Sequence, residues 1–256
     1  MTRGTGAEYS SHIGLNDHRR IAAELKRAQK SPRNTAAYSR MVNRPLARQV
    51  AAWGHMIGLS PNGATAISAT LSAGGLAILV LLPPSPIAGL LVSVLLAAGY
   101  LFDSVDGQLA RLRGGGSLSG EMLDHTVDCV KTVCLHLAVL VHLFRFPPLD
   151  GNWVLLIPIA FLVVDVLSFF GLVTIPLLRR VHGDQRATDP TQREHPLRRW
   201  ILLPTDYGVF CWMFILLGWP LLFFLGYSAM FVVNLLALAA ALIKWGRELT
   251  AMDRTG

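Results

Sequence analysis

Apolar residues fall in long blocks after about residue 60, and short polar stretches separate these blocks. A helix needs about 20 consecutive apolar residues to cross the hydrocarbon core of a bilayer. The blocks predict six transmembrane helices, at 63–82, 87–111, 118–146, 153–179, 206–218 and 221–247. The fifth block is short for a span, so its helix could begin earlier, near Trp200. The pattern therefore predicts an all-α integral membrane protein.

A different periodicity precedes the first block. Between residues 35 and 59, apolar side chains recur every three or four positions. Arg40, Arg44 and Arg48 recur every four positions on another face. This is the pattern of an amphipathic helix that lies in the membrane interface with its arginines near lipid phosphates, and a helix packed on the protein is the alternative. Pro45 should either kink this helix or begin a second segment.

The first 34 residues are polar and mixed in charge, and we expect much of this tail to be mobile. Ile21 and Leu25 nevertheless indicate a short helix within it. The Ser60-Pro61-Asn62 sequence is typical of a helix cap and marks the start of the first span. The chain thus divides into 1–34, 35–59 and 60–256.

Charge patterning gives the orientation. Only 15% of the residues are charged, whereas about a quarter is usual in soluble domains. The net charge is +7, but the basic residues lie between the apolar blocks and form no stripe typical of nucleic-acid binding. They collect on one side of the predicted spans, in the N-terminal region, at 111–113, at 179–199 and at 244–254. The positive-inside rule therefore predicts a multi-pass protein of the plasma membrane with both termini in the cytoplasm.

Four aspartates lie inside the predicted spans. Asp103 and Asp106 are near the cytoplasmic end of the second span, and Asp124 and Asp128 are near the start of the third. Carboxylates at membrane depth are costly and usually mark functional sites. Spacings of three and four residues put each pair on one helix face. The glycine-rich loop at 114–117 is short, so the two helices should be antiparallel neighbours and the four carboxylates can converge.

Such a group requires cations. Arg111 and Lys131 are too few to neutralise it, which weighs against a purely structural cluster of ion pairs. Carboxylate oxygens suit Mg²⁺, Mn²⁺ or Ca²⁺, and two such ions could hold a diphosphate and activate an attacking oxygen. Gly107 and Gly120 would let a phosphate group approach the backbone, and Arg111 could contact it.

These residues resemble the signature of the CDP-alcohol phosphotransferase (CDP-alcohol phosphatidyltransferase) family, D-x2-D-G-x2-A-R-x8-G-x3-D-x3-D. All eight fixed positions match: Asp103, Asp106, Gly107, Ala110, Arg111, Gly120, Asp124 and Asp128. The likeness extends to six spans with cytoplasmic termini and to Pro61, Asn62 and Thr65 at the opening of the first span. The segment 38–45 looks like that of the subgroup that makes inositol-phosphate phosphodiesters.

The resemblance implies a phospholipid-biosynthetic transferase. It would move a phosphatidyl or other phospho-alcohol group from a CDP-alcohol, often CDP-diacylglycerol, to an acceptor hydroxyl, and release CMP. It implies two Mg²⁺ or Mn²⁺ ions, a cytoplasmic active site and a homodimer, with 60–256 as the six-helix catalytic domain. Asp103, Asp106 and Asp124 would be metal ligands, and Asp128 a ligand or the general base. The implied CDP-binding residues are Asn62, Thr65, Asp103, Gly107, Ala110, Arg111 and Gly120.

The acceptor is less constrained. Lys131, Arg179 and Arg180 could bind an acceptor phosphate, which favours inositol phosphate or a similar polyol phosphate. Alternatively, Lys131 only neutralises Asp128, and the arginines set topology and contact lipid headgroups. A cardiolipin-synthase-like enzyme that uses phosphatidylglycerol, or a member that uses glycerol phosphate, would present similar chemistry.

Two readings from other classes compete with an enzyme. A cation transporter would also place carboxylates in the membrane, and a catalytically inactive scaffold would also keep the fold. Neither explains why Gly107, Ala110, Arg111 and Gly120 stand at fixed spacing from the aspartates. Two further polar residues lie in the spans: His136 is expected to make helix contacts, and Asp165 to line the cavity or hydrogen-bond a neighbour.

Overall fold

The computed structural model describes residues 15–28, 36–115, 117–182 and 203–254, and no strand occurs among them. Helices therefore satisfy almost all of the backbone polar groups, as a bilayer requires. In chain order the elements are α1 (Leu15–Arg27), η1 (Ser39–Asn43), α2 (Arg44–Met56), α3 (Pro61–Leu81), α4 (Pro86–Leu112), α5 (Leu118–Arg145), η2 (Asn152–Leu155), α6 (Leu156–Val181), η4 (Leu203–Thr205), α8 (Tyr207–Met213), η5 (Phe214–Gly218) and α9 (Pro220–Asp253).

Within the described parts of the chain, five helical stretches are long and apolar enough to cross a membrane: α3, α4, α5, η2 with α6, and α9. The all-helical membrane architecture predicted from the sequence is confirmed at this level. The predicted fifth span differs, because α8 and η5 together cover only Tyr207–Gly218. At 1.5 Å per residue this stretch is about 18 Å long, well short of a hydrocarbon core of about 30 Å. The earlier start considered near Trp200 lies outside the described residues.

The sequence sets where α3, α4 and α5 begin. Ser60, Ser85 and Ser117 each accept a hydrogen bond from the backbone N–H three residues on, at 3.0, 3.1 and 3.0 Å. Proline follows the first two serines, where its missing N–H is harmless. Between α4 and α5, Gly114 and Gly115 adopt positive φ angles of +91° and +116°, which favour glycine. The tight turn makes α5 run back antiparallel to α4, as predicted, and both helices pack on α3.

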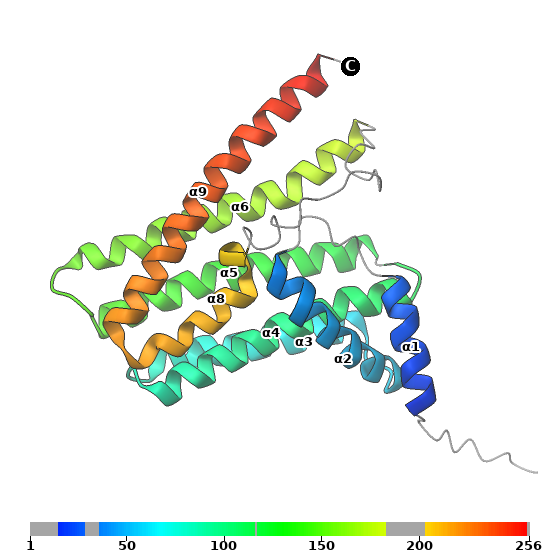
Figure 1. The fold of residues 1–256 in the computed structure, drawn as a ribbon, viewed down its shortest axis with the longest axis horizontal. Coiled ribbons are helices and arrows are strands. Elements are labelled where there is room, and N and C mark those ends of the chain that lie inside the picture. Colours follow the sequence, from blue (N-terminus) through cyan, green and yellow to red (C-terminus); the bar gives the residue numbers. More distant parts are fainter. Residues whose placement is uncertain (1–14, 29–35, 116, 183–202, 255–256) are drawn as a thin grey trace, which may run out of the picture.

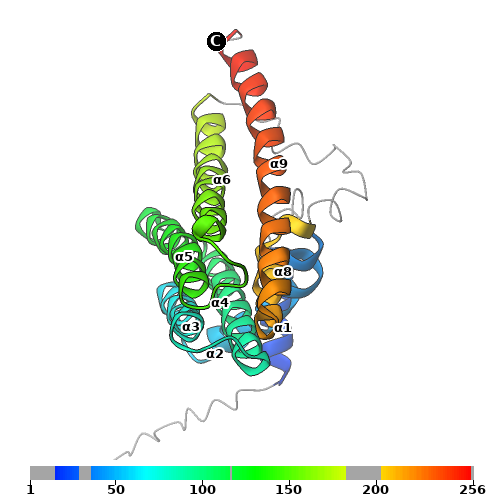
Figure 2. The ribbon, with the colours of Figure 1, turned by 90° about the vertical axis from the view of Figure 1, so that its left-hand side faces the viewer.

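The helices α3, α4 and α5 lie side by side and form the body of the molecule (Figures 1 and 2). The C-terminal parts of α6 and α9 project from this body in both views. An aromatic core joins α8, η5 and α9 to the body, with Phe161 of α6 packed against it. Its buried rings include Phe161, Phe210, Phe214, Phe223 and Tyr227. This core fixes α8 against α4, which matters for the site below.

The N-terminal region is more ordered in its described part than the sequence indicated. The helix α1 packs on α2 and α4, and its Ile21 and Leu25 are buried. Small residues make this packing close, since Ala47 and Ala51 of α2 have no exposed surface. Residues 15–28 are thus packed against α2 and α4, while 1–14 and 29–34 lie outside the described residues.

Pro45 begins a second segment, which was one of the two predicted outcomes. The turn before it is a wide π-turn, η1, closed by the Arg44 N–H to the Ser39 carbonyl. A proline ring in a regular α-helix would collide with the carbonyl four residues earlier. The wider turn removes that collision, and the chain remains helical from η1 into α2.

Candidate active site

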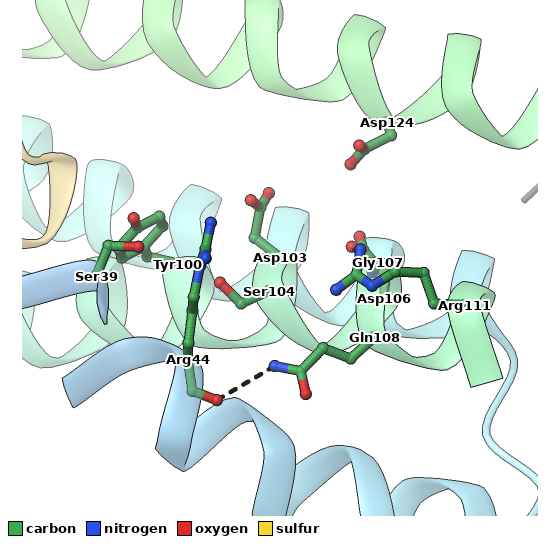
Figure 3. Close-up of a pocket in the computed structure, with 10 residues that line it drawn as sticks. All are labelled: Ser39, Arg44, Tyr100, Asp103, Ser104, Asp106, Gly107, Gln108, Arg111 and Asp124. Carbon is green, nitrogen blue, oxygen red and sulfur yellow. Dashed lines mark hydrogen bonds between the residues drawn. The ribbon is translucent and has the colours of Figure 1, made fainter. Parts of the chain in front are cut away.

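Three carboxylates converge between α4 and α5. Asp103 and Asp106 come from α4, and Asp124 faces them from α5 (Figure 3). One oxygen from each of the three lies within 4.8 Å of the others. The short glycine loop turns α5 back along α4, and both helices pack on α3, so their carboxylates face each other. Asp103, Asp106 and Asp124 thus come together as the sequence predicted, and the fourth aspartate, Asp128, lies close to Asp103.

Asp106 is the most firmly held of the three. Its side chain is buried, and the Thr65 hydroxyl of α3 donates a 2.7 Å hydrogen bond to Oδ2. The backbone N–H of Gly107 donates to Oδ1. Two donors fix both oxygens of the carboxylate, which is the usual way in which a metal ligand is oriented by its neighbours. Thr65, which the resemblance implies as a CDP-binding residue, contacts the aspartate directly.

Asp128 lies beside this group, in an ion pair with Lys131 at 2.6 Å. Lys131 also bonds to Asp103 and donates a 3.2 Å hydrogen bond to the Ser68 hydroxyl. One lysine thus links α5 to α4 and neutralises part of the acidic group. Among the described residues, the three-carboxylate group does not include Asp128. Of the two roles expected for Lys131, partner of Asp128 is the one the structure shows.

A cavity of about 260 Å³ adjoins the carboxylates. Figure 3 shows two arginines in it, Arg111 from α4 and Arg44 from the start of α2. A Cβ atom at Gly107 would lie 3.3 Å from Arg111 Nη1, so the glycine leaves room for the guanidinium to lie over the helix. The full set of lining residues is Ser39, Arg44, Tyr100, Asp103, Ser104, Asp106, Gly107, Gln108, Arg111 and Asp124.

The predicted CDP-binding residues separate into two groups. Asp103, Gly107 and Arg111 line the cavity. Asn62 and Gly120 lie at the starts of α3 and α5 and face each other there, since a Cβ at Gly120 would be 3.9 Å from Asn62 Oδ1. Ala110, half-buried on α4, is not among the lining residues.

Five lining residues were not predicted as site residues: Ser39, Arg44, Tyr100, Ser104 and Gln108. Tyr100 lies three residues before Asp103 and four before Ser104, so helical spacing places it on a face shared with each of them. Arg44 was expected near lipid phosphates, but the structure turns it into the cavity. Nothing in the local sequence of η1 and α2 indicates that contact.

The arginines predicted to bind the acceptor are not in the cavity. Arg179 forms a two-pronged ion pair with Glu248 of α9, at 2.6 Å from Nε to Oε1 and 2.8 Å from Nη2 to Oε2. This pair ties the C-terminal ends of α6 and α9 together. Arg180 is exposed. Neither residue lines the cavity beside the aspartates.

A second polar network crosses the core away from the aspartates. His136 of α5 hydrogen-bonds the Tyr227 hydroxyl at 2.6 Å and Asp165 Oδ2 at 2.9 Å. The imidazole is buried, and its two ring nitrogens join α5 to α9 and to α6. Of the two roles considered for Asp165, hydrogen bonding to a neighbour is the one observed, and His136 makes helix contacts as predicted.

Tyr227→Phe is expected to lower the free energy of unfolding by about 1–2 kcal/mol, because it leaves one buried imidazole nitrogen without a partner. His136→Ala should cost more, since it removes both bonds and a packed ring. Thermal unfolding of the purified protein in detergent measures both effects. His182→Ala changes an exposed histidine just after the end of α6; it is the control and should leave the melting temperature unchanged. Equal melting temperatures for all three variants would contradict a stabilising network.

Comparison with known proteins gives one family match. Residues 59–245 match the model of the CDP-alcohol phosphatidyltransferase family. No curated protein sequence matches the chain. The matched segment contains all eight signature residues and begins after α2, so the part of the cavity wall formed by η1 and α2 lies outside it.

Three solved structures of Mycobacterium tuberculosis phosphatidylinositol phosphate synthase resemble this one, each at 23% identity. The complex with manganese and citrate covers 77% of this chain and 87% of its own, with a TM-score of 0.49. The structure with CDP-DAG bound covers 80% and 93%, with a TM-score of 0.49. The apo form covers 75% and 92%, with a TM-score of 0.47.

Proposed function

The chain belongs to the CDP-alcohol phosphatidyltransferase family, and we propose that its donor is CDP-diacylglycerol and its acceptor a polyol phosphate such as inositol phosphate. The product would be a phospholipid, and CMP would be released. The observation that carries the proposal is the group formed by Asp103, Asp106 and Asp124, with oxygens within 4.8 Å, beside a cavity that also holds two arginines. Anionic and cationic groups together suit a metal-bound diphosphate.

The donor set fits hard divalent cations. Three carboxylates offer only oxygen ligands, the kind that Mg²⁺ and Mn²⁺ prefer. Oxygens on opposite sides of one Mg²⁺ lie about 4.2 Å apart, so small side-chain rotations would close the 4.8 Å group around an ion. We propose two ions, held by Asp103, Asp106 and Asp124, with Asp128 as a further ligand or the base. When bound, they would neutralise the diphosphate and make its phosphorus more electrophilic.

The other steps of the proposed reaction depend on residues of the chain. The acceptor hydroxyl attacks the phosphorus that carries the diacylglycerol; a new phosphorus–oxygen bond forms, and the bond to CMP breaks. CMP leaves with the electron pair, and the hydroxyl proton passes to Asp128. Arg111 lies over Gly107, where it can contact the nucleotide phosphates. Thr65 and the Gly107 N–H keep Asp106 oriented.

Lys131 supports a phosphate-bearing acceptor. Its ammonium contacts Asp128 at 2.6 Å, so an anion held there would lie beside the proposed base. Arg179 and Arg180 give less support, because the first is paired with Glu248 and the second is exposed away from the cavity. A phosphatidylglycerol-using, cardiolipin-synthase-like reaction and a glycerol-phosphate-using reaction remain the rival outcomes of the acceptor test below.

We further propose the membrane placement implied by the charge pattern. Six spans, counting the short α8–η5 stretch, would leave both termini and the active site on the cytoplasmic side of the plasma membrane. The helix at 39–56 would lie in the interface, because its apolar residues Met41 and Leu46 and the C-cap residue Ile57 are 56%, 52% and 72% exposed. The domain division at 34 and 59 and a homodimer complete this proposal.

The test is CMP release from CDP-diacylglycerol by the purified full-length protein. We expect release with Mg²⁺ or Mn²⁺, none in excess chelator, and recovery when metal is restored. Equal amounts of inositol, inositol phosphate, glycerol phosphate, serine and phosphatidylglycerol then compete as acceptors, and the lipid products are separated. A preference for inositol phosphate supports the acceptor proposal. Full turnover in chelator would refute the metal site, and a preference for serine or inositol would refute a phosphate-bearing acceptor.

A further inference from the structure

One wall of the cavity is built from η1 and the start of α2, upstream of residue 59, where the family match begins. Ser39 and Arg44 line the cavity from this wall. Figure 3 shows the Arg44 side chain rising from α2 past Ser104, with its guanidinium at the level of Asp103. A cation therefore faces the carboxylates from the side opposite α5, in addition to Arg111 on α4.

This wall is fastened to α4 at the level of the site. The Asn43 amide donates a 2.6 Å hydrogen bond to the Ser104 hydroxyl, and Asn43 is 2% exposed. The Gln108 amide donates at 3.2 Å to the Arg44 carbonyl. Ser104 and Gln108, the α4 residues in these two bonds, both line the cavity. These two hydrogen bonds fix the position of Arg44 along the axis of α4.

The same wall is fastened to α8 by a second set of contacts. Asp206 Oδ2 accepts a 2.9 Å hydrogen bond from the Ser39 N–H, and Asp206 Oδ1 accepts one of 2.9 Å from the Gly208 N–H. The Tyr38 ring lies on Gly208 so closely that a Cβ there would be 2.1 Å from it. The Trp212 indole N–H donates to the Tyr38 hydroxyl at 2.9 Å. Asp206 thus caps α8 and also holds η1.

Asp206 and Arg44 are both charged side chains in partly or fully buried positions, where a charge is costly. Asp206 is 5% exposed, so burial makes its ionised carboxylate costly unless hydrogen bonds compensate. Burial also lowers the pKa of Arg44, which is half-buried but stays a cation at neutral pH. The two groups interact favourably with each other. A fold that used these residues only for packing would not need a guanidinium held inside the cavity.

We propose that Arg44 binds a phosphate group of the substrate in this cavity, and that Asp206 is the positioning residue that holds η1 so that Arg44 can reach it. This inference rests on the proposed function, which supplies substrates that carry phosphate. The guanidinium fork suits phosphate oxygens, and its place opposite Arg111 would let two arginines contact the anion from different helices. The phosphate could belong to the CDP-alcohol or to the acceptor, and separate KM values distinguish them.

The experiment compares Arg44→Ala and Arg44→Lys with Arg40→Ala and Arg48→Ala. The two controls remove the same charge one turn earlier and one turn later, from positions that do not line the cavity. Arg44→Ala should raise the KM of one phosphate-bearing substrate about 10- to 100-fold, the usual effect of losing a charge-assisted hydrogen bond. Arg44→Lys should recover part of this loss. Asp206→Asn should raise the same KM by a smaller factor, since the amide keeps one acceptor oxygen.

An unchanged KM for both substrates in Arg44→Ala, or a change no larger than in the two controls, would overturn the phosphate-binding role. Asp206 variants that lower thermal stability and kcat but leave that KM unchanged would overturn the positioning role. If Arg44→Ala does not fold, Arg44→Gln replaces it, because it keeps most of the side-chain length without the charge. Calorimetric binding of CDP with Mn²⁺ to the same variants gives a readout that does not need turnover. It separates failure of this inference from failure of the proposed reaction.

Discussion

Asp124→Asn is expected to weaken Mn²⁺ binding by more than about 100-fold and to abolish CMP release. Changing an outer-shell partner of a metal ligand typically costs about 10- to 100-fold in affinity, so loss of a ligand's charge should cost more. Asp124 is the residue of α5 in the three-carboxylate group, so it closes that group from the side opposite Asp103 and Asp106. Calorimetric titration with Mn²⁺ measures the affinity, and release of CMP measures the activity.

Asp165→Asn is the matched control for this change. It removes a carboxylate from the same bundle but from the His136 network, outside the metal-binding group. Thr65→Val tests the outer shell, because it removes the hydrogen bond to Asp106 and leaves all three carboxylates. We expect it to bind Mn²⁺ with an affinity between those of wild type and Asp124→Asn. Wild-type Mn²⁺ affinity in Asp124→Asn would show that the three carboxylates are not the metal site.

The convergence of Asp103, Asp106 and Asp124 could be predicted because it follows from local rules. Helical spacing places Asp103 and Asp106 on one face, and a loop too short for any other path turns α5 back along α4. The starts of α3 and α4 are also local features, because a serine cap followed by proline favours the start of a helix. Each of these features depends on residues close together in the chain.

The features that the sequence did not predict depend on contacts between distant segments. Arg179 and Glu248 are 69 residues apart, and only the packing of α6 against α9 brings them together. The periodicity at 35–59 places Arg44 on a polar face, but that face meets the cavity because η1 docks on α8. The contact that sets this docking joins Ser39 to Asp206, 167 residues later. A helical pattern predicts which residues share a face of a helix, but it does not predict which other helix that face packs against.

The contacts of Asp128 also could not be predicted from the sequence, although its partner Lys131 is only three residues away. Four-residue spacing predicts that it shares a face with Asp124, yet it is not one of the three carboxylates of the group, and it contacts Lys131 and Asp103. Which carboxylate a lysine reaches depends on the rotation of α5 about its axis and on rotamers, which spacing does not determine. Because Lys131 also bonds Asp103, Asp128 is linked to the metal-binding group through a cation.

This arrangement makes different predictions for the two aspartates of α5. Asp128→Asn is expected to keep Mn²⁺ and CDP affinities within a few-fold of wild type, because its carboxylate lies outside the three-oxygen group. Its kcat should fall by about 10²- to 10⁴-fold, the usual contribution of a general base. Single-turnover measurement of CMP release gives the rate of transfer, and calorimetry gives the affinities.

Asp128→Glu and Lys131→Met separate the base from its ion pair. Glutamate keeps a carboxylate but moves it, so partial activity would show that the proton acceptor matters beyond charge. Lys131→Met leaves Asp128 in place and removes its 2.6 Å partner, so it should raise the acceptor KM more than it lowers kcat. Equal losses of Mn²⁺ affinity in Asp128→Asn and Asp124→Asn would instead make Asp128 a fourth ligand. A wild-type kcat in Asp128→Asn would remove it from the reaction, and another group would have to take the hydroxyl proton.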